Sequence, residues 1–226
     1  EMAYETLVNQ DDPLKLKEKG ARNLFNLLML DMENRVASSV RSVSNMGSGS
    51  TVASKWSSAT AGTSDPFGDI TTAKNFIRSN TGYDANTIII GREAYNSLIK
   101  HADILDRIKY VQRGVVTADL LAALFDVDNV YVGNSIINSG EENQADSFSD
   151  VWGDDTIVAR FSPPETDGRN PSLAYGFRWT NPMFGAPMAV DSWDDRDGLF
   201  TNLRVQYYQD EKITAKDLGY VLKDCA

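Results

Sequence analysis

One long amphipathic helix near the start of the chain is the feature that most limits the possible folds. Apolar residues recur there at steps of three and four, which places them on one helical face: Ala21, Leu24, Phe25, Leu28, Met32, Val36, Val40 and Val43. From Pro13 to Val43 such a helix would be roughly 45 Å long at about 1.5 Å per residue. Gly20 weakens the first turns, so it is an alternative start. The length favours a helix that lies across a sheet or carries contacts between subunits, and an ordinary core helix is the alternative.

The middle of the chain alternates between helices and strands. Residues 44–68 are rich in Ser, Gly, Thr and Ala, which is typical of a loop, and we expect Trp56 to pack from within it. Thr117 is suited to cap a helix, and Gly82 to end one. The spacing of apolar residues predicts a helix, a strand, two helices and a strand, at residues 69–79, 87–91, 94–108, 118–125 and 127–132. This order predicts a mixed α/β layer.

Strands dominate the second half of the chain. Residues 139–150 are polar and acidic, so we expect a surface loop there. Asn181-Pro182 indicates a turn. Four strands are expected, followed by a short apolar segment, at residues 156–161, 173–179, 186–193, 203–208 and 217–222. The chain as a whole is therefore predicted to be α+β.

The charge balance and the cysteine content exclude several classes of protein. The net charge is −10, and an acidic chain is repelled by phosphate backbones, so tight nucleic-acid binding is not expected. Cys225 is the one cysteine, so no internal disulfide can form, and this fits a reducing compartment. No apolar run approaches the roughly 20 residues that cross a bilayer. The sequence begins with Glu1, from which we expect that it starts inside a longer gene product.

The residues that catalysis would need are scarce. His101 is the one histidine, and a Ser-His-Asp or Cys-His arrangement would have to use it. It lies in a helical stretch, so we interpret it as a surface or helix-end residue. One histidine and one distant cysteine also exclude the common zinc sites.

Two acidic groups are interpreted as turns. Asp191, Asp194, Asp195 and Asp197 precede Gly198, but the calcium-loop pattern fails at both of its ends. We therefore expect a solvated turn, with a weak cation site as the alternative. Asp154-Asp155, directly before a strand, is likewise expected to be a turn.

Two further patterns indicate structure more than ligand binding. Gly91 stands between a strand and a helix without the further glycines of a phosphate loop, so we expect it to ease that turn. Arg107, Lys109 and Arg113 surround Tyr110, but three charges are too few for a nucleic-acid patch. We expect them to bond neighbouring elements or subunits. The sequence thus predicts no catalytic, cofactor-binding or metal-ligating residue and no enzyme.

Several stretches in order resemble the tailed-phage major capsid proteins of the HK97-like fold, in particular the group called major capsid protein E. The resemblance rests mainly on residues 86–98, 104–110 and 114–125. It covers roughly residues 14–226 and includes shorter pieces at 55–57, 65–66, 130–133, 151–153 and 217–222.

The resemblance implies a fold and a set of domains. The helix at residues 13–43 would be the spine helix of a peripheral domain that also holds a β-sheet, and an axial α/β domain would follow. The expected segments are residues 1–64 for the spine helix and loop, 65–190 for the axial domain, and 191–226 for the strands that return to the peripheral domain and the C-terminal segment. The family's N-terminal arm and extended loop are not recognisable here, and we expect both to be absent.

The resemblance also implies a function and partners. It predicts a subunit that self-assembles into an icosahedral phage or prophage head and encloses double-stranded DNA without sequence-specific binding. The expected partners are copies of the chain itself, as pentamers and hexamers, with scaffold or decoration proteins as further candidates and no membrane. The expected location is the virion, assembled in the bacterial cytoplasm. An encapsulin-like compartment shell is the first alternative, and an α/β hydrolase with His101 beside a serine and a carboxylate is the second.

Overall fold

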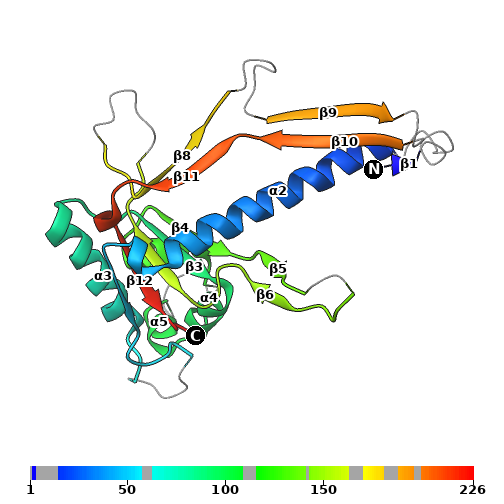
Figure 1. Ribbon diagram of the computed structural model, residues 1–226. Coiled ribbons are helices and arrows are strands. Elements are labelled where there is room, and N and C mark those ends of the chain that lie inside the picture. The colour runs from blue at the N-terminus through cyan, green and yellow to red at the C-terminus, as the bar shows by residue number, and fades with distance from the viewer. Residues whose placement is uncertain are drawn as a thin grey trace. The chain divides into compact units, whose positions relative to one another are not determined.

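The computed structural model describes residues 2–3, 15–57, 63–108, 116–140, 143–162, 170–180, 188–195 and 200–226 (Figure 1). The chain forms two compact units. We call Glu1–Glu33 with Gly176–Lys212 the ribbon unit, and Asn34–Tyr175 with Ile213–Ala226 the sheet unit. Whether these units correspond to a peripheral and an axial domain, and whether the boundaries predicted at residues 64 and 190 hold, stays a prediction.

The predicted long helix is present as α2, Leu16–Arg41 (Figure 1). Gly20 lies inside it and does not start it, and Pro13 lies outside the described residues. The helix is buried only toward its C-terminal end, at Ala37 and Val40, whereas Leu24 is 37% exposed. The apolar stripe is therefore covered at one end, and the interpretation as an ordinary core helix fits that end alone.

A five-stranded mixed sheet forms the centre of the sheet unit. Its order is β2 (Ser48–Thr51), β12 (Gly219–Lys223), β7 (Thr156–Ala159), β3 (Thr87–Gly91) and β4 (Asn129–Gly133). The outer pairs β2–β12 and β3–β4 are parallel, and β7 pairs antiparallel with both of its neighbours. The β-branched run that predicted β3 is buried on both faces of the sheet, as expected for such a run.

The apolar segment predicted near the C-terminus is β12, and it lies between strands that come far earlier in the chain. Tyr220 pairs with Ser48 on one side and with Val158 on the other. The largest fully buried side chains among the described residues all belong to the sheet unit: Trp56, Ile70, Ile77, Ile88, Ile90, Leu98, Ile104, Leu121, Ile157, Leu173, Leu218 and Leu222.

Local capping residues set the ends of the helices around this sheet. The helix α3, Pro66–Thr81, begins three residues before the prediction because the Asp65 carboxylate accepts a hydrogen bond from the Gly68 amide. Gly82, at φ +75°, ends it in the left-handed conformation, as predicted. The helix α6, Ala118–Phe125, is confirmed, and the Thr117 hydroxyl accepts from the Leu120 amide. The predicted helix at 94–108 is divided into α4, Arg92–Leu98, and α5, Ala102–Ile108.

Two segments expected to be loops contain strands. The loop predicted at 44–68 holds a short 3-10 turn, Val43–Asn45, and the strand β2, although Trp56 packs as expected and is 1% exposed. The surface loop predicted at 139–150 is part of a hairpin of β5, Ile136–Asn138, and β6, Phe148–Asp150. In both places small or polar residues adopt strand geometry because of their pairing partners.

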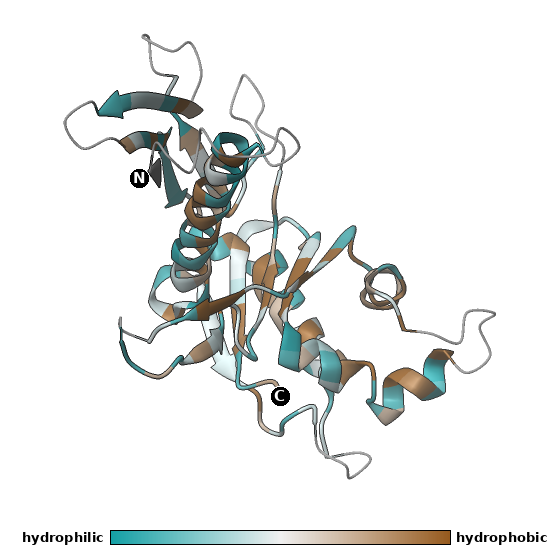
Figure 2. Cartoon of the chain, turned by 90° about the vertical axis from the view of Figure 1, so that its right-hand side faces the viewer, coloured by the Kyte–Doolittle hydropathy of each residue, from teal (hydrophilic) through white to brown (hydrophobic). Residues whose placement is uncertain are grey.

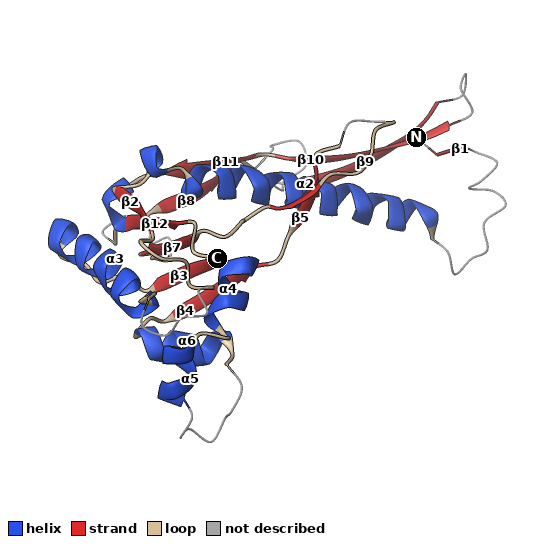
Figure 3. Cartoon of the chain, turned by 90° about the horizontal axis from the view of Figure 1, so that it is seen from below, coloured by secondary structure: helices blue, strands red, loops and turns tan. Residues whose placement is uncertain are grey.

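The ribbon unit is built on long antiparallel strands (Figure 3). The strand β10, Phe200–Tyr207, pairs with β1, Met2–Ala3, on one side and with β9, Met188–Asp195, on the other. A second pair joins β8, Ala174–Arg178, to β11, Gln209–Ile213, and β11 was not predicted. The predicted turn at Asn181-Pro182 lies outside the described residues.

The described helices offer no membrane span. None of them is both long enough and apolar enough to cross a bilayer.

Candidate functional site

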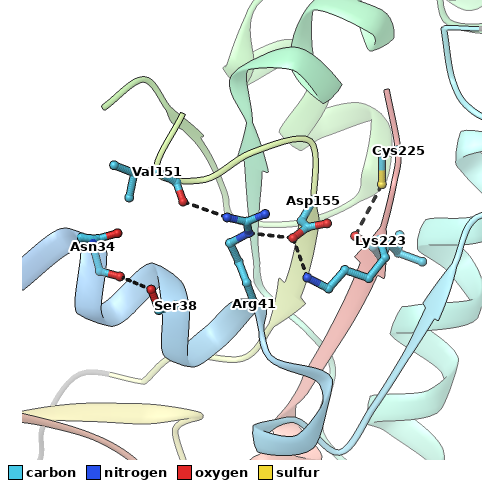
Figure 4. A network of polar contacts seen from close by, with 8 residues as sticks. Asn34, Ser38, Arg41, Val151, Asp155, Lys223 and Cys225 are labelled. Carbon is cyan, nitrogen blue, oxygen red and sulfur yellow. Dashed lines mark hydrogen bonds and ion pairs between the residues drawn. The ribbon is translucent and has the colours of Figure 1, made fainter. Parts of the chain in front are cut away.

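A buried carboxylate, Asp155, holds together three distant parts of the sheet unit (Figure 4). Asp155 is 3% exposed and stands directly before β7. Its Oδ2 accepts from Nε of Arg41, the last residue of α2, at 2.6 Å and from Nζ of Lys223, in β12, at 2.7 Å. Arg41 also donates to the carbonyl of Val151 at 3.0 Å. The turn expected at Asp154-Asp155 is present at residues 153–154, and the sequence did not indicate that Asp155 is enclosed by two cations.

The ion pairs of Asp155 with Arg41 and Lys223 are suited to a structural role. One carboxylate faces two cations, and both of its close contacts are ion pairs that join separate parts of the chain. The Arg41 and Lys223 side chains are 30% and 29% exposed, so both keep some water while Asp155 keeps almost none. The arrangement fixes the end of α2 and the strand β12 to the start of β7.

Two glycines allow the backbone to close around Asp155. Gly153 has φ +58°, and a Cβ there would lie 2.5 Å from the guanidinium of Arg41. Gly91 has an ordinary extended backbone at φ −64°, but a Cβ there would lie within 1.9 Å of the Gly153 carbonyl oxygen. Gly91 is therefore needed because two segments of the chain approach each other closely, more than because it eases a turn. The sequence did not indicate this close approach.

His101 is buried, which corrects half of its prediction. It lies one residue before α5, as a helix-end residue would, but it is 6% exposed and not on the surface. Its Nε2 lies 2.8 Å from the hydroxyl of Ser64, which is itself buried, and its Nδ1 accepts from the Asp103 amide at 3.3 Å. The structure thus places a serine and a carboxylate near the histidine, as the hydrolase alternative required.

The hydrogen bonds argue against a catalytic role for this group. Since Nδ1 of His101 accepts from a backbone amide, the ring proton is on Nε2, and Nε2 donates to the Ser64 oxygen. A general base would need the opposite arrangement, with a bare nitrogen facing the serine hydroxyl. The Asp103 carboxylate lies 3.8 Å from Nδ1, beyond hydrogen-bonding distance, so it does not orient the ring for catalysis. His101 caps the start of α5 by accepting from the Asp103 amide, and its hydrogen bond with Ser64 is a buried polar link between two segments of the chain.

The acidic cluster of the second half does not form a turn. Asp191, Asp194 and Asp195 lie within β9, and Asp197 is outside the described residues. Asp191 pairs with Arg204 at 2.9 Å, and Asp194 accepts from the Thr201 hydroxyl at 2.7 Å. Because neighbouring residues of a strand point to opposite faces, these carboxylates do not converge on one ion. Among the residues that the structure describes, no group of three or more His, Cys, Asp or Glu is placed to hold a metal.

Burial makes the thiol of Cys225 unreactive. Its side chain is fully buried, and burial raises the pKa of the thiol to about 12. Thiolates and not thiols react, so Cys225 is a packing residue over the physiological range of pH.

Trp56 has a polar partner as well as a packing role. Its indole nitrogen donates to Asp69 Oδ2 at 2.9 Å. Burial raises the pKa of the Asp69 carboxyl above its ordinary value, the bond from Trp56 opposes this, and the nearby charge of Asp65 adds to it.

Arg107 behaves as predicted, since its guanidinium stacks over the ring of Phe67 at 3.8 Å and joins α5 to α3. Lys109 and Arg113 lie outside the described residues.

An open hollow of about 530 Å³ lies beside the β5–β6 hairpin, and the sequence did not reveal it. The side chains of Glu93, Ile136, Phe148, Asp150 and Asp154 line it, together with Ser149 and Gly153. Ile136 and Phe148 are 55% and 63% exposed. The hollow is wide, and the described residues that line it include no histidine or cysteine.

Comparison with known proteins supports a structural role. The sequence model of the family described as phage major capsid protein E matches residues 46–208. The major capsid protein of Burkholderia phage BcepMu is 31% identical over 176 residues, which is 75% of this chain and 56% of that protein. The chain thus spans little more than half the length of this curated relative.

Two solved structures resemble the chain. A phage-related protein from Bordetella bronchiseptica RB50 has a TM-score of 0.79 at 24% identity, over 92% of this chain and 67% of that one. The capsid of Myoviridae phage XM1 has a TM-score of 0.51 at 14% identity, over 96% of this chain and 66% of that one.

Proposed function

Because the chain belongs to the phage major capsid protein E family, we propose that it is a structural subunit that self-assembles into an icosahedral phage head around double-stranded DNA. The family match carries the proposal, since it extends from the start of β2 through β10. The likeness to a phage capsid also confirms the predicted HK97-like α+β fold. The family favours a phage head over the encapsulin-like alternative.

The surface of the chain supports assembly from many copies. Large apolar side chains are exposed on both units, among them Leu27, Phe148, Trp179 and Val190, each more than half exposed. A shell built from many copies can bury such side chains between identical subunits. We expect the subunits to form pentamers and hexamers, with scaffold or decoration proteins as further partners.

The charge of the chain fits a wall that encloses DNA without holding a sequence. The net charge of −10 opposes tight binding to phosphate backbones, so the genome and the shell would not adhere strongly. We place the protein in the virion, after assembly in the host bacterial cytoplasm, and assign it no catalytic role.

Within the shell, we assign the sheet unit to the axial domain and the ribbon unit to the peripheral domain. The α/β composition of the sheet unit and the long helix and paired strands of the ribbon unit support this assignment.

Electron microscopy of the full-length gene product tests the proposal. We expect closed shells or rings, and particles isolated from infected or induced cells should contain nuclease-protected double-stranded DNA. Shells that contain a protein cargo and no DNA would favour the compartment alternative. Monodisperse monomers under every condition of concentration and salt would contradict both.

A further inference from the structure

The hollow beside the β5–β6 hairpin has a composition that suits a basic and apolar partner. Three carboxylates, of Glu93, Asp150 and Asp154, line it together with two large apolar side chains, Ile136 and Phe148. The described residues that line the hollow include no lysine or arginine to neutralise these charges. An occupant with cations placed around an apolar centre would bury the apolar groups and pair the carboxylates.

The geometry of the hairpin gathers these groups on one face. Asp150 pairs directly with Ile136, and Phe148 pairs with Asn138. Directly paired residues, and residues two apart in a strand, share a face of the sheet. Ile136, Phe148 and Asp150 therefore point to the same side of the hairpin.

The N-terminal half of α2 carries the matching pattern on this same chain. Residues 15–22 hold four basic residues and one acidic residue, Glu18, which pairs with Lys15 at 3.5 Å. Lys17 and Lys19 are exposed, and Leu24 and Leu27 beyond them are 37% and 63% exposed. Figure 2 shows hydrophilic and apolar residues in alternation along this helix.

In rotation about the axis of α2, the two leucines lie between the two lysines. At about 100° per residue, Leu24 and Lys17 lie roughly 60° and 80° to one side of Leu27, and Lys19 lies roughly 80° to the other. The face we call the α2 stripe (Lys17, Lys19, Leu24 and Leu27) thus has a basic part followed, roughly 8–15 Å further along the helix at 1.5 Å per residue, by an apolar part, where the hollow combines apolar and acidic side chains.

We propose that the β5–β6 hairpin of one copy docks on the α2 stripe of a second copy, with Ile136 and Phe148 against Leu24 and Leu27. Glu93, Asp150 and Asp154 then face Lys17 and Lys19. The charge complementarity selects a second copy, because a chain of net charge −10 presents this basic stripe together with an acidic hollow. The contact joins two different surfaces, and such heterologous contacts close into rings when the rotation between copies allows it. The inference rests on the proposed function, since it requires copies that are neighbours in a shell.

Crosslinking between two tagged full-length proteins tests the contact. Leu27→Cys and Phe148→Cys are placed in separate proteins of different mass, both with Cys225→Ala, and are assembled together and treated with a short bismaleimide. We expect a mixed dimer, formed about tenfold or more faster than with Leu105→Cys in place of Phe148→Cys, because a formed contact raises the effective concentration to the millimolar range. Leu105 is a matched control, since it is 42% exposed in α5, away from the hairpin.

Charge reversal gives a second, independent readout. Lys17→Glu with Lys19→Glu, or Glu93→Lys with Asp150→Lys, should each lower the crosslinking yield, and a mixture of the two reversed proteins should restore it. The effect should weaken as salt rises, because the charges are exposed and screened.

The outcomes separate this inference from the proposed function. Normal shells in which the Leu27–Phe148 pair links no faster than the control would overturn the docking contact and leave the capsid function standing. A Phe148→Cys protein that links only to a different protein would also overturn it. Failure of the unmodified protein to form any shell would overturn the capsid function, and the contact with it.

Discussion

Asp155 is the residue whose charge the sheet unit depends on most directly. It is almost fully buried between Arg41 and Lys223, which are themselves about one third exposed. Loss of the carboxylate would leave two partly buried cations close together without their counter-charge. The cost of an unpaired charge exceeds the value of the pair that is lost.

Asp155→Asn should therefore destabilise the protein by about 2–3 kcal/mol, less than for a fully buried pair because both cations are partly hydrated. The shape of the side chain is kept, so the loss reports the charge. Denaturant unfolding measures it. Asp126→Asn is the matched control, since that carboxylate is fully exposed and lies 3.7 Å from Lys74, and it should change stability by less than about 0.5 kcal/mol. Equal effects of the two substitutions would refute the assigned role of Asp155.

The sequence could not have revealed this cluster. Arg41 is 114 residues from Asp155 along the chain, and Lys223 is 68 residues away. Nothing local distinguishes Asp155 from its neighbour Asp154. The same holds for His101, whose partner Ser64 is 37 residues away. Burial of a polar residue is decided by what packs on it, and the local pattern does not contain that information.

At the scale of elements, the Asn138 side chain makes three hydrogen bonds at the end of the β5–β6 hairpin. Its Oδ1 accepts from the backbone amides of Gly140 and Ser147, each at 2.9 Å, and its Nδ2 donates to Asp146 at 2.8 Å. These exposed bonds add to the two that Ser139 donates to the Ser147 carbonyl. Such a hairpin can open without unfolding of the five-stranded sheet.

Asn138→Ala should loosen the hairpin and leave the rest of the sheet unit intact. Each lost hydrogen bond contributes about 0.5–1.5 kcal/mol, so amide exchange at β5 and β6 should accelerate by about tenfold or more. Hydrogen exchange with mass spectrometry measures this, and the midpoint of global unfolding should not move. Ser149→Ala, in the same exposed hairpin, is the control and should leave exchange unchanged. Unaltered exchange in Asn138→Ala would show that the turn does not need these bonds.

The elements that the sequence predicted well are those with local causes. The Thr117 cap, the left-handed Gly82 and the β-branched run of β3 act within a few residues, so α6 and β3 appear where they were expected and α3 ends at Gly82 as expected. The strand β2 has the sequence Ser-Gly-Ser-Thr, which carries no strand signal, and only pairing with β12 makes it a strand. The polar strand β11 was missed for the same reason.

At the scale of the whole molecule, the two units share one chain that passes between them three times, at residues 33–34, 175–176 and 212–213. The strand β12 therefore belongs to the same unit as β3 and β7, although the ribbon strands β9 and β10 come between them in sequence. We expect the two units to unfold as separate cooperative bodies.

Val221→Ala, in the fully buried centre of β12, should speed amide exchange in β3 and β7 but not in β9. The loss of two buried methyl groups should cost about 2–3 kcal/mol. Val190→Ala in β9 is the matched control, because Val190 is 56% exposed and its truncation should have little effect. Exchange of β12 in step with β9 would contradict the division of the chain into these units.

The position of β12 near the C-terminal end of the sequence also determines when the five-stranded sheet can be completed during synthesis. β7 leaves the ribosome about 60 residues before β12 does, so the sheet stays open for roughly 3 to 12 seconds at translation rates of about 5–20 residues per second. Throughout that interval β2 and β7 present unpaired edges to every other nascent copy nearby. A host that produces many copies at once must therefore shield these edges until β12 arrives, so the crowding of ribosomes on the message bears on how many sound subunits are made.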